Sequence, residues 1–331
     1  MKTANPFFQK YNSMKQDIVV NHDFRNALHT TLLLITMLAL LGLLGWFLAG
    51  TVGIVWALIL GAVIMWLAQR ASPQLVMRMY KAQPLSAQDA PALQQIVTEL
   101  AKRAKLPAVP QLYYIPSSMM NAFAVGRREN AAIGITDGLL RNLEMRELTG
   151  VLAHELSHIR NNDMRVMSMA DAISRVTSMF SSFGKFLLIF NLPLILFGSA
   201  SISWWAILLM IIAPTLTGLL QLALSRTREF EAGLDAIQLT RDPAGLINAL
   251  RKLEHYSQNW LQQIFFPGAR VPAPSILRTH PHTEDRIARL SELAEQKPEL
   301  ASLPTVPQLN LPGRLPQISR RPGWNVMGIW Y

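Results

Sequence analysis

The sequence predicts an α-rich integral membrane protein with four transmembrane helices in two hairpins and a small α+β domain. Half of the 331 residues are hydrophobic and only 16% are charged, which is low for a soluble protein. Residues 26–69 and 186–225 contain no Asp, Glu, Lys or Arg. Because a membrane-spanning helix needs about 20 apolar residues, each interval is long enough for two spans and a tight turn.

Each charge-free interval contains one run of small residues where we expect the helical hairpin to turn: Gly50–Gly53 (GTVG) and Gly198–Ser201 (GSAS). The alternative for the first interval is a cleaved signal peptide. It is disfavoured because the apolar run resumes directly after Gly53, without a convincing cleavage site. The alternative for the second interval is a pair of buried core helices, but so long a run without charge is typical of membrane spans.

The basic residues predict the orientation of the spans. They flank the intervals at their outer ends, whereas neither turn carries a charge; the flanking residues are Lys2, Lys10, Lys15, Arg25, Arg70, Arg78, Lys81, Lys185, Arg226 and Arg228. Lys and Arg collect on the cytoplasmic side, so both termini and all polar segments are expected there.

The net charge of +10 has the same explanation, since cytoplasmic flanks face anionic lipid. We expect no nucleic-acid binding, because no basic run with interleaved aromatic residues occurs. The absence of cysteine excludes disulfides and thiolate metal ligands and fits a reducing compartment.

Six segments follow from these boundaries. They are a cytoplasmic N-terminal segment (1–28), a first transmembrane hairpin (29–69), the first part of a cytoplasmic domain (70–185), a second transmembrane hairpin (186–225), the second part of that domain (226–297) and a Pro-rich tail (298–331). The tail is expected to be extended or disordered, and its aromatic end could either lie at the membrane interface or remain unstructured.

Local patterns predict the elements of the cytoplasmic domain. Strands are expected at Gln111–Ile115, Ala122–Val125 and Ala131–Thr136, each bounded by Pro or Asn or by a neighbouring turn. Helices are expected at 86–104 with Ser86 as the N-cap, and at 139–143, 145–160, 164–185, 244–264 and 283–295.

The predicted helix 145–160 carries the motif HExxH. His154 and His158 are four residues apart and therefore lie on one helix face, where both imidazoles can bind one Zn²⁺. Glu155 would then point towards a metal-bound water, take its proton and later pass it to the leaving amine. The alternative is an ordinary amphipathic helix with two solvated histidines.

A catalytic zinc site needs a third protein ligand, which must be His, Asp or Glu in a chain without cysteine. Glu229 is the best candidate because it follows the second charge-free interval closely, at the cytoplasmic surface; Glu231 is the second candidate. The alternative for Glu229 is a salt bridge to Arg226 or Arg228.

The reaction also needs a donor for the developing oxyanion, for which His280 and Arg286 are available. The alternative for their segment, residues 278–287, is a polar loop that caps a helix.

Several sequence runs together resemble the HtpX family of membrane-bound zinc metalloproteases, which are related to the CAAX prenyl endopeptidases. The runs are NAFA (121–124), GIT (134–136) with GLL (138–140), VLAHELSH (151–158), SRTREF (225–230) and THP (279–281) with Arg286-Ile287. They occur in this order with a hydrophobic hairpin on either side of the HExxH domain, and the similarity covers roughly residues 30–295. This joint pattern is far more specific than HExxH alone.

The resemblance implies a zincin-like metalloprotease domain with one Zn²⁺ per chain, in an endopeptidase of the bacterial inner membrane. Its expected role is quality control, with misfolded or damaged membrane proteins as the polypeptide substrates. The matching positions imply that His154, His158 and Glu229 bind zinc and that Glu155 is the catalytic base. They also imply that Asn121 lies on an edge strand near substrate, with His280 and Arg286 near the site.

One position departs from the family pattern. The family usually has an aspartate four residues after the third ligand, where it can orient a zinc-bound histidine, and this chain has Gly233 there. Asp235 and Glu231 are the available substitutes. Gly233 favours one alternative function, a zinc-stabilised, non-catalytic membrane scaffold, whereas the intact HExxH motif speaks against it. A CAAX-type processing protease is the other alternative, and the four predicted spans argue against it, since that branch has a larger helical chamber.

Overall fold

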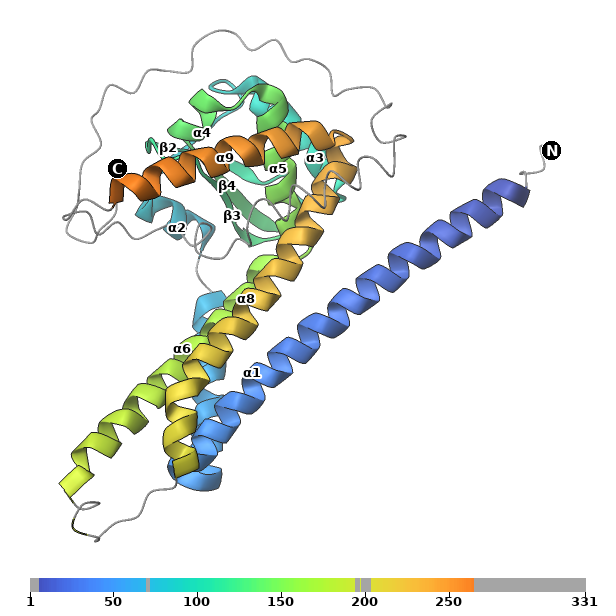
Figure 1. Ribbon diagram of the computed structural model, residues 1–331. Helices are drawn as coiled ribbons and strands as arrows, with labels where there is room; N and C mark the ends of the chain where they lie inside the picture. The colour runs from blue at the N-terminus through green and yellow to red at the C-terminus, as the bar shows by residue number, and fades with distance from the viewer. Residues whose placement is uncertain (1–5, 70–71, 194–196, 198–203, 265–331) are drawn as a thin grey trace. The chain divides into compact units, whose positions relative to one another are not determined.

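A computed structural model describes residues 6–69, 72–193, 197 and 204–264 (Figure 1). The chain divides into two compact units, which we call the helical unit (Met1–Ala68 and Met167–Thr227) and the sheet unit (Gln69–Val166 and Arg228–Tyr331). Four predicted features lie outside the described residues: the turn at 198–201, the helix at 283–295, the Pro-rich tail, and the side chains of His280 and Arg286.

The helical unit begins with α1 (Pro6–Gln69), which consists of two helices joined at a kink (Figure 1). The helix breaks at Ala49 and at Gly50, whose φ of 57° favours glycine, so the chain turns at the first predicted break. Beyond the turn the two arms approach closely, because a Cβ on Gly53 would collide with the carbonyl oxygen of Gly45. Small residues permit such backbone contact between membrane helices.

Two further long helices, α6 (Asp163–Phe190) and α8 (Trp204–Thr240), supply the rest of this unit. Within it, the Ser181 hydroxyl of α6 donates a hydrogen bond to the Met210 carbonyl of α8. Among the described residues, the segments Leu28–Leu67 and Trp204–Thr240 are long and apolar enough to cross a membrane.

The division between the units falls inside α6, between Val166 and Met167, whereas the charge-free interval placed the membrane boundary at residue 186. Exposed apolar side chains on α6 already begin at Met179. The charge-free interval begins only after Lys185, so the membrane boundary at residue 186 stays a prediction.

The sheet unit contains four strands in the order β1-β2-β4-β3. They are β1 (Gln83–Pro84), β2 (Gln111–Ile115), β3 (Ala122–Arg127) and β4 (Asn130–Thr136), of which β2 and β4 run parallel and the other neighbours antiparallel. The three predicted strands agree with β2, β3 and β4 to within two residues at each end. Among the strands of the described residues β3 lies at an edge of the sheet, so one side of its backbone has no neighbouring strand there.

Five helices complete the sheet unit, together with the ends of α6 and α8: α2 (Pro73–Met79), α3 (Pro91–Arg103), α4 (Asp137–Asn142), α5 (Met145–Arg160) and α9 (Pro243–Ile264). The predicted N-cap at Ser86 is wrong. Ser86 and Asp89 instead form a turn, in which the Ser86 hydroxyl donates to the Asp89 carboxylate over 2.6 Å. The helix begins only at Pro91, whose missing N–H and fixed φ suit the first helical position.

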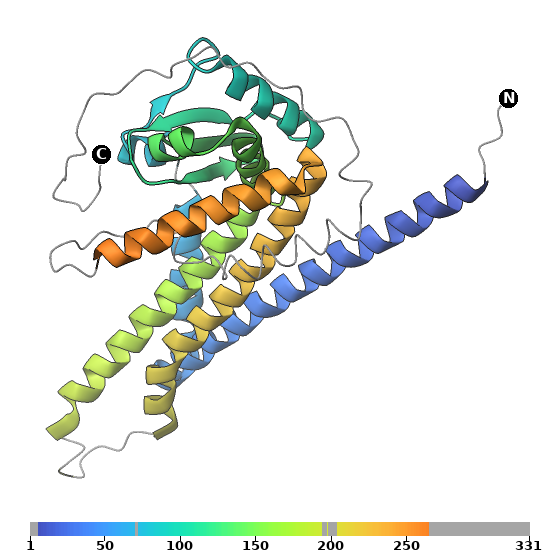
Figure 2. The same ribbon diagram turned by 45° about the horizontal axis from the view of Figure 1, so that its top comes forward.

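The two faces of the sheet pack against different helices. Alternate residues of β4, such as Ile133 and Ile135, contribute to the main core with α3, α5 and α9. On the other face, Ala132 contacts a small cluster around Met77 of α2. Figure 2 shows α9 crossing α5, which carries the HExxH motif. The sheet thus supports α5 on one side and α2 on the other.

Close packing between α5 and α9 depends on Gly150. A Cβ at this position would lie 2.9 Å from the backbone N and Cα of Leu246, so α9 would have to shift. We expect Gly150→Ala to lower the free energy of unfolding by about 1–3 kcal/mol relative to Gly218→Ala, at which nothing lies within 4 Å. Both substitutions improve helix propensity equally, so the difference in thermal unfolding in detergent isolates the steric effect. Equal unfolding temperatures would contradict this packing.

Candidate metal centre

Packing of the opposite face orients the HExxH segment of α5. Leu152 and Leu156 are fully buried in the main core, and the helical period turns His154 and His158 to the other side. The start of the helix is fixed by a capping box, in which the Glu147 carboxylate accepts a hydrogen bond from the Glu144 N–H over 2.8 Å. Contacts that do not involve the histidines therefore fix both the position and the rotation of α5.

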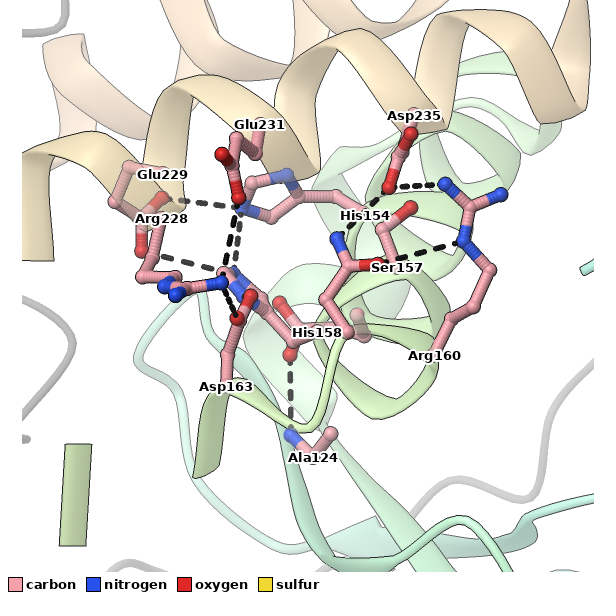
Figure 3. A network of polar contacts seen from close by, with 12 residues as sticks. Ala124, His154, Ser157, His158, Arg160, Asp163, Arg228, Glu229, Glu231 and Asp235 are labelled. Atoms are coloured by element: carbon pink, nitrogen blue, oxygen red, sulfur yellow. Dashed lines mark hydrogen bonds and ion pairs between the residues drawn. The ribbon is translucent and has the colours of Figure 1, made fainter. Parts of the chain in front are cut away.

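His154, His158 and Glu229 bring three possible ligand atoms together (Figure 3). The two Nε2 atoms lie 3.2 Å apart, and Glu229 Oε2 lies 3.2 Å from the Nε2 of His154. Glu229 Oε1 lies 3.6 Å from the Nε2 of His158. A tetrahedral ion with ligand distances of about 2.0–2.1 Å separates neighbouring ligand atoms by roughly 3.3 Å. The described side chains thus fit one zinc ion.

Glu229 reaches the histidines from α8, and its carboxylate is directed towards them (Figure 3). The neighbouring cation, Arg228, instead places Nη1 3.3 Å from Asp163 Oδ1 and 3.4 Å from Glu231 Oε2. Glu231 thus pairs with Arg228, while Glu229 belongs to the metal-compatible group. This geometry separates the two candidates for the third ligand.

The edge strand β3 holds the carboxylate of Glu155. The backbone N–H of Ala124, which is labelled in Figure 3, donates a hydrogen bond to Glu155 Oε2 over 3.0 Å. The Glu155 side chain is buried. Because backbone groups alternate along an antiparallel strand, the N–H and C=O groups of Ala122 point to the same open side of β3 as the Ala124 N–H. The base and the free strand edge therefore adjoin each other.

Asp163 orients the second histidine, a contact that was not predicted from the sequence. It is the first residue of α6, directly after a turn in which Asn162 has a φ of 55°. Its Oδ2 lies 2.8 Å from His158 Nδ1, which leaves Nε2 directed at the proposed ion. The available signal was an aspartate at the predicted start of a helix, one turn beyond HExxH.

The carboxylates around His158 also change its protonation. Burial lowers the pKa of this imidazole, but the hydrogen bond to Asp163 and the charges of Glu229 and Glu155 outweigh burial and raise it to about 9. In the metal-free protein the ring is therefore protonated at neutral pH, and a metal ion must displace that proton to bind.

Comparison with known proteins identifies the family. Residues 87–294, well over half of the chain, match the model of Peptidase family M48. The chain belongs to peptidase family M48. Protease HtpX homolog of Salinibacter ruber is 35% identical over 282 residues, which cover 81% of this chain and 98% of the relative. Protease HtpX of Legionella pneumophila is 36% identical over 291 residues, with 80% and 98% covered.

These matches confirm the resemblance to the HtpX group and identify this M48 peptidase as a metalloprotease. The two segments of the described chain that are long and apolar enough to cross a membrane agree with the membrane-bound character of that group. Among solved structures, the crystal structure of S. mikatae Ste24p matches with a TM-score of 0.47 and 20% identity, over 85% of this chain and 66% of that one.

Two other predicted residues have structural contacts of their own in this M48 peptidase. Asp235 forms an ion pair with Arg160 and accepts a hydrogen bond from Asn161 Nδ2 over 2.8 Å, so it anchors the end of α5. Asn121 directly precedes β3, where its backbone N–H donates to Thr136 Oγ1 over 2.9 Å. Asn121 is buried beside the edge strand. Asp235 was considered as a residue that orients a zinc-bound histidine, but in the structure Asp163 makes that contact, to His158.

Asp163→Ala is expected to lower zinc affinity and proteolysis by about 10–100-fold, the usual effect of removing a group that orients a metal ligand. Asp163→Asn should recover part of both, since its amide oxygen can still accept a hydrogen bond from the ring. Competition with a zinc chelator measures the affinity. Asp171→Ala is the matched control, because Asp171 forms an exposed pair with Arg175 on the same helix. Equal zinc affinities in Asp163→Ala and Asp171→Ala would contradict the role of Asp163.

Proposed function

We propose that this M48 peptidase is a zinc-dependent endopeptidase that hydrolyses misfolded or damaged membrane proteins close to the cytoplasmic face of the bacterial inner membrane. The convergence of His154, His158 and Glu229 beside Glu155 is the observation that carries the proposal. One zinc ion per chain is held by the first three residues. Quality control of membrane proteins is the corresponding cellular role.

The chain's own residues divide the chemistry between them. Bound zinc would supply a Lewis acid and lower the pKa of a water molecule. Glu155 accepts the proton of the attacking water and returns it to the nitrogen of the leaving amine. The Ala124 N–H holds the Glu155 carboxylate for this task, and Asp163 keeps the His158 ring in its binding orientation.

The open edge of β3 supports an extended polypeptide as the substrate. A peptide that pairs with this edge would gain backbone hydrogen bonds beside Glu155 without any sequence requirement. In a folded protein most extended segments are already paired within a sheet, so unfolded segments are favoured. Asn121, next to the same strand, is proposed to lie near the bound peptide.

The location near the bilayer is supported by the charge-free intervals and by the flanking basic residues. We propose four spans in two hairpins, with the N-terminus, the active site and the C-terminus in the cytoplasm. Glu229 follows the second charge-free interval after only three residues, on the continuous helix α8. Membrane proteins are therefore the proposed substrates, and the enzyme itself is proposed to be embedded in the lipid bilayer.

Metal removal tests the proposal. The full chain, purified in detergent and stripped of metal with a chelator, is expected to lose cleavage of unfolded casein and to regain it with Zn²⁺. In proteoliposomes, a destabilised membrane protein should be cleaved faster than its stable parent. Undiminished proteolysis by the metal-free chain would refute the mechanism, and selective cleavage of a prenylated peptide would favour the CAAX-type alternative.

A further inference from the structure

The short helix α2 has two apolar faces, and the sheet covers one of them. Pro73 and Met77, one helical turn apart, are buried. Met77 packs with Tyr113 and Ala132 on the side of the sheet that faces away from α5. A Cβ on Gly126 would lie 2.7 Å from Pro73 Cγ, so the β3–β4 hairpin also packs against this face. The sheet unit thus fixes how α2 is rotated.

The second apolar face of α2 is exposed. Leu75 and Met79 are also one turn apart and lie on the side opposite Met77; they are 56% and 58% exposed. Tyr80, which follows the helix, is 37% exposed and stacks at a tilt against Phe123 of β3. A single exposed apolar side chain is ordinary, but Leu75 and Met79 share one face of a helix of only seven residues, and Tyr80 directly follows them in the chain. We call these three residues the apolar patch of α2.

Basic residues border this patch. Arg78 lies on α2 between Leu75 and Met79, and Lys81 follows Tyr80; both are exposed. An apolar surface bordered by Lys and Arg is typical of segments that bind the surface of anionic membranes. A second copy of this chain fits less well, because a symmetric contact would bring the same cations face to face.

The chain also restricts where α2 can be. The apolar segment Leu28–Leu67 ends six residues before Pro73. Six residues span at most about 22 Å when fully extended, so α2 stays close to the point where the chain leaves the bilayer. A lipid surface is therefore within reach of the patch for geometric reasons alone.

We propose that the exposed patch of α2, formed by Leu75, Met79 and Tyr80 with Arg78 and Lys81, binds the anionic surface of the lipid bilayer. The sheet is then docked on the membrane through the face opposite α5. This inference depends on the membrane span that ends at Leu67. It is independent of the zinc mechanism, so an experiment can refute lipid binding by α2 without refuting zinc-dependent proteolysis, and the reverse.

Site-specific fluorescence tests the proposal in the full chain. The sequence contains no cysteine, so a single introduced cysteine carries the only label. Two single-cysteine variants, Leu75→Cys and Met79→Cys, are each labelled with an environment-sensitive fluorophore. Each is placed in nanodiscs of anionic lipid that carries a nitroxide on the acyl chain, close to the headgroup. Gln95→Cys is the matched control, because Gln95 is exposed on α3, which packs on the other face of the sheet. The labelled side chains are all exposed, so unfolding temperatures should match that of the parent.

We expect the emission at positions 75 and 79 to shift to the blue and to be strongly quenched by the nitroxide lipid, while position 95 remains unquenched. Quenching should weaken when Arg78→Gln and Lys81→Gln are combined, or when the lipid is zwitterionic. Quenching at 75 and 79 no greater than at 95 would overturn the proposal. A blue shift without quenching would also overturn it, since the patch would then be covered by protein, such as a second copy.

Discussion

Glu155→Gln is expected to lower kcat/KM for unfolded casein by at least about 10²–10⁴-fold, the usual contribution of a general base, while zinc binding is retained. Glutamine cannot accept the proton of the attacking water. Its amide oxygen can still accept the hydrogen bond that the Ala124 N–H donates to Glu155 Oε2 over 3.0 Å. The substitution should therefore remove the chemistry without disturbing the fold.

Zinc content by atomic absorption and casein cleavage are measured on the same preparation. Glu129→Gln makes the same chemical change at an exposed position of the β3–β4 hairpin and should leave both quantities unchanged. If Glu155→Gln cleaves casein at the parental rate, Glu155 is not the base. If it instead loses zinc, its role is structural.

Glu229→Gln is expected to lower zinc affinity by more than the 10–100-fold that follows removal of a residue that only orients a ligand. The substitution would remove the one anionic member of the proposed ligand set, and proteolysis should fall with zinc occupancy. The carboxylate oxygens of Glu229 lie 3.2 Å from the Nε2 of His154 and 3.6 Å from the Nε2 of His158. A neutral amide at this distance is a poorer partner for a divalent cation.

Glu231→Gln is the matched control for this experiment, because it lies on the same helix and interacts with Arg228 over 3.4 Å. We expect it to retain zinc and most of its activity. A competition titration with a chelating dye measures both affinities. Loss of zinc in Glu231→Gln, together with retention in Glu229→Gln, would show that the third ligand has been placed two residues too early.

Features that depend on local spacing could be predicted from the sequence. The i, i+4 histidines of HExxH share a face in any α-helix, and the strands at 111–115 and 131–136 follow from their own residues. The first hairpin turn could be predicted from the run of small residues at Gly50–Gly53, and Gly50 there adopts a φ of 57° that other residues avoid. The family membership followed from ordered motifs across the chain, and the comparisons confirm it.

Features that depend on the crossing of distant segments required the tertiary structure. The sequence favours Glu229 over Glu231 as the third ligand, but only the folded structure shows where each side chain points. Glu229 lies at the histidines, and Glu231 lies beside Arg228. The start of α3 moved from Ser86 to Pro91 because a Ser86–Asp89 turn competes with the helix.

The residues that orient the site show the same division. The sequence by itself predicted His154, Glu155 and His158 as the centre of the candidate metal site, because a helix fixes their relative positions within a turn. The tertiary structure decided what holds them: the Asp163 contact to His158 crosses from α5 to α6, and the Ala124 contact to Glu155 crosses from a strand to a helix. Such contacts depend on how separate helices and strands pack together, which the helix or strand periodicity of a sequence does not specify.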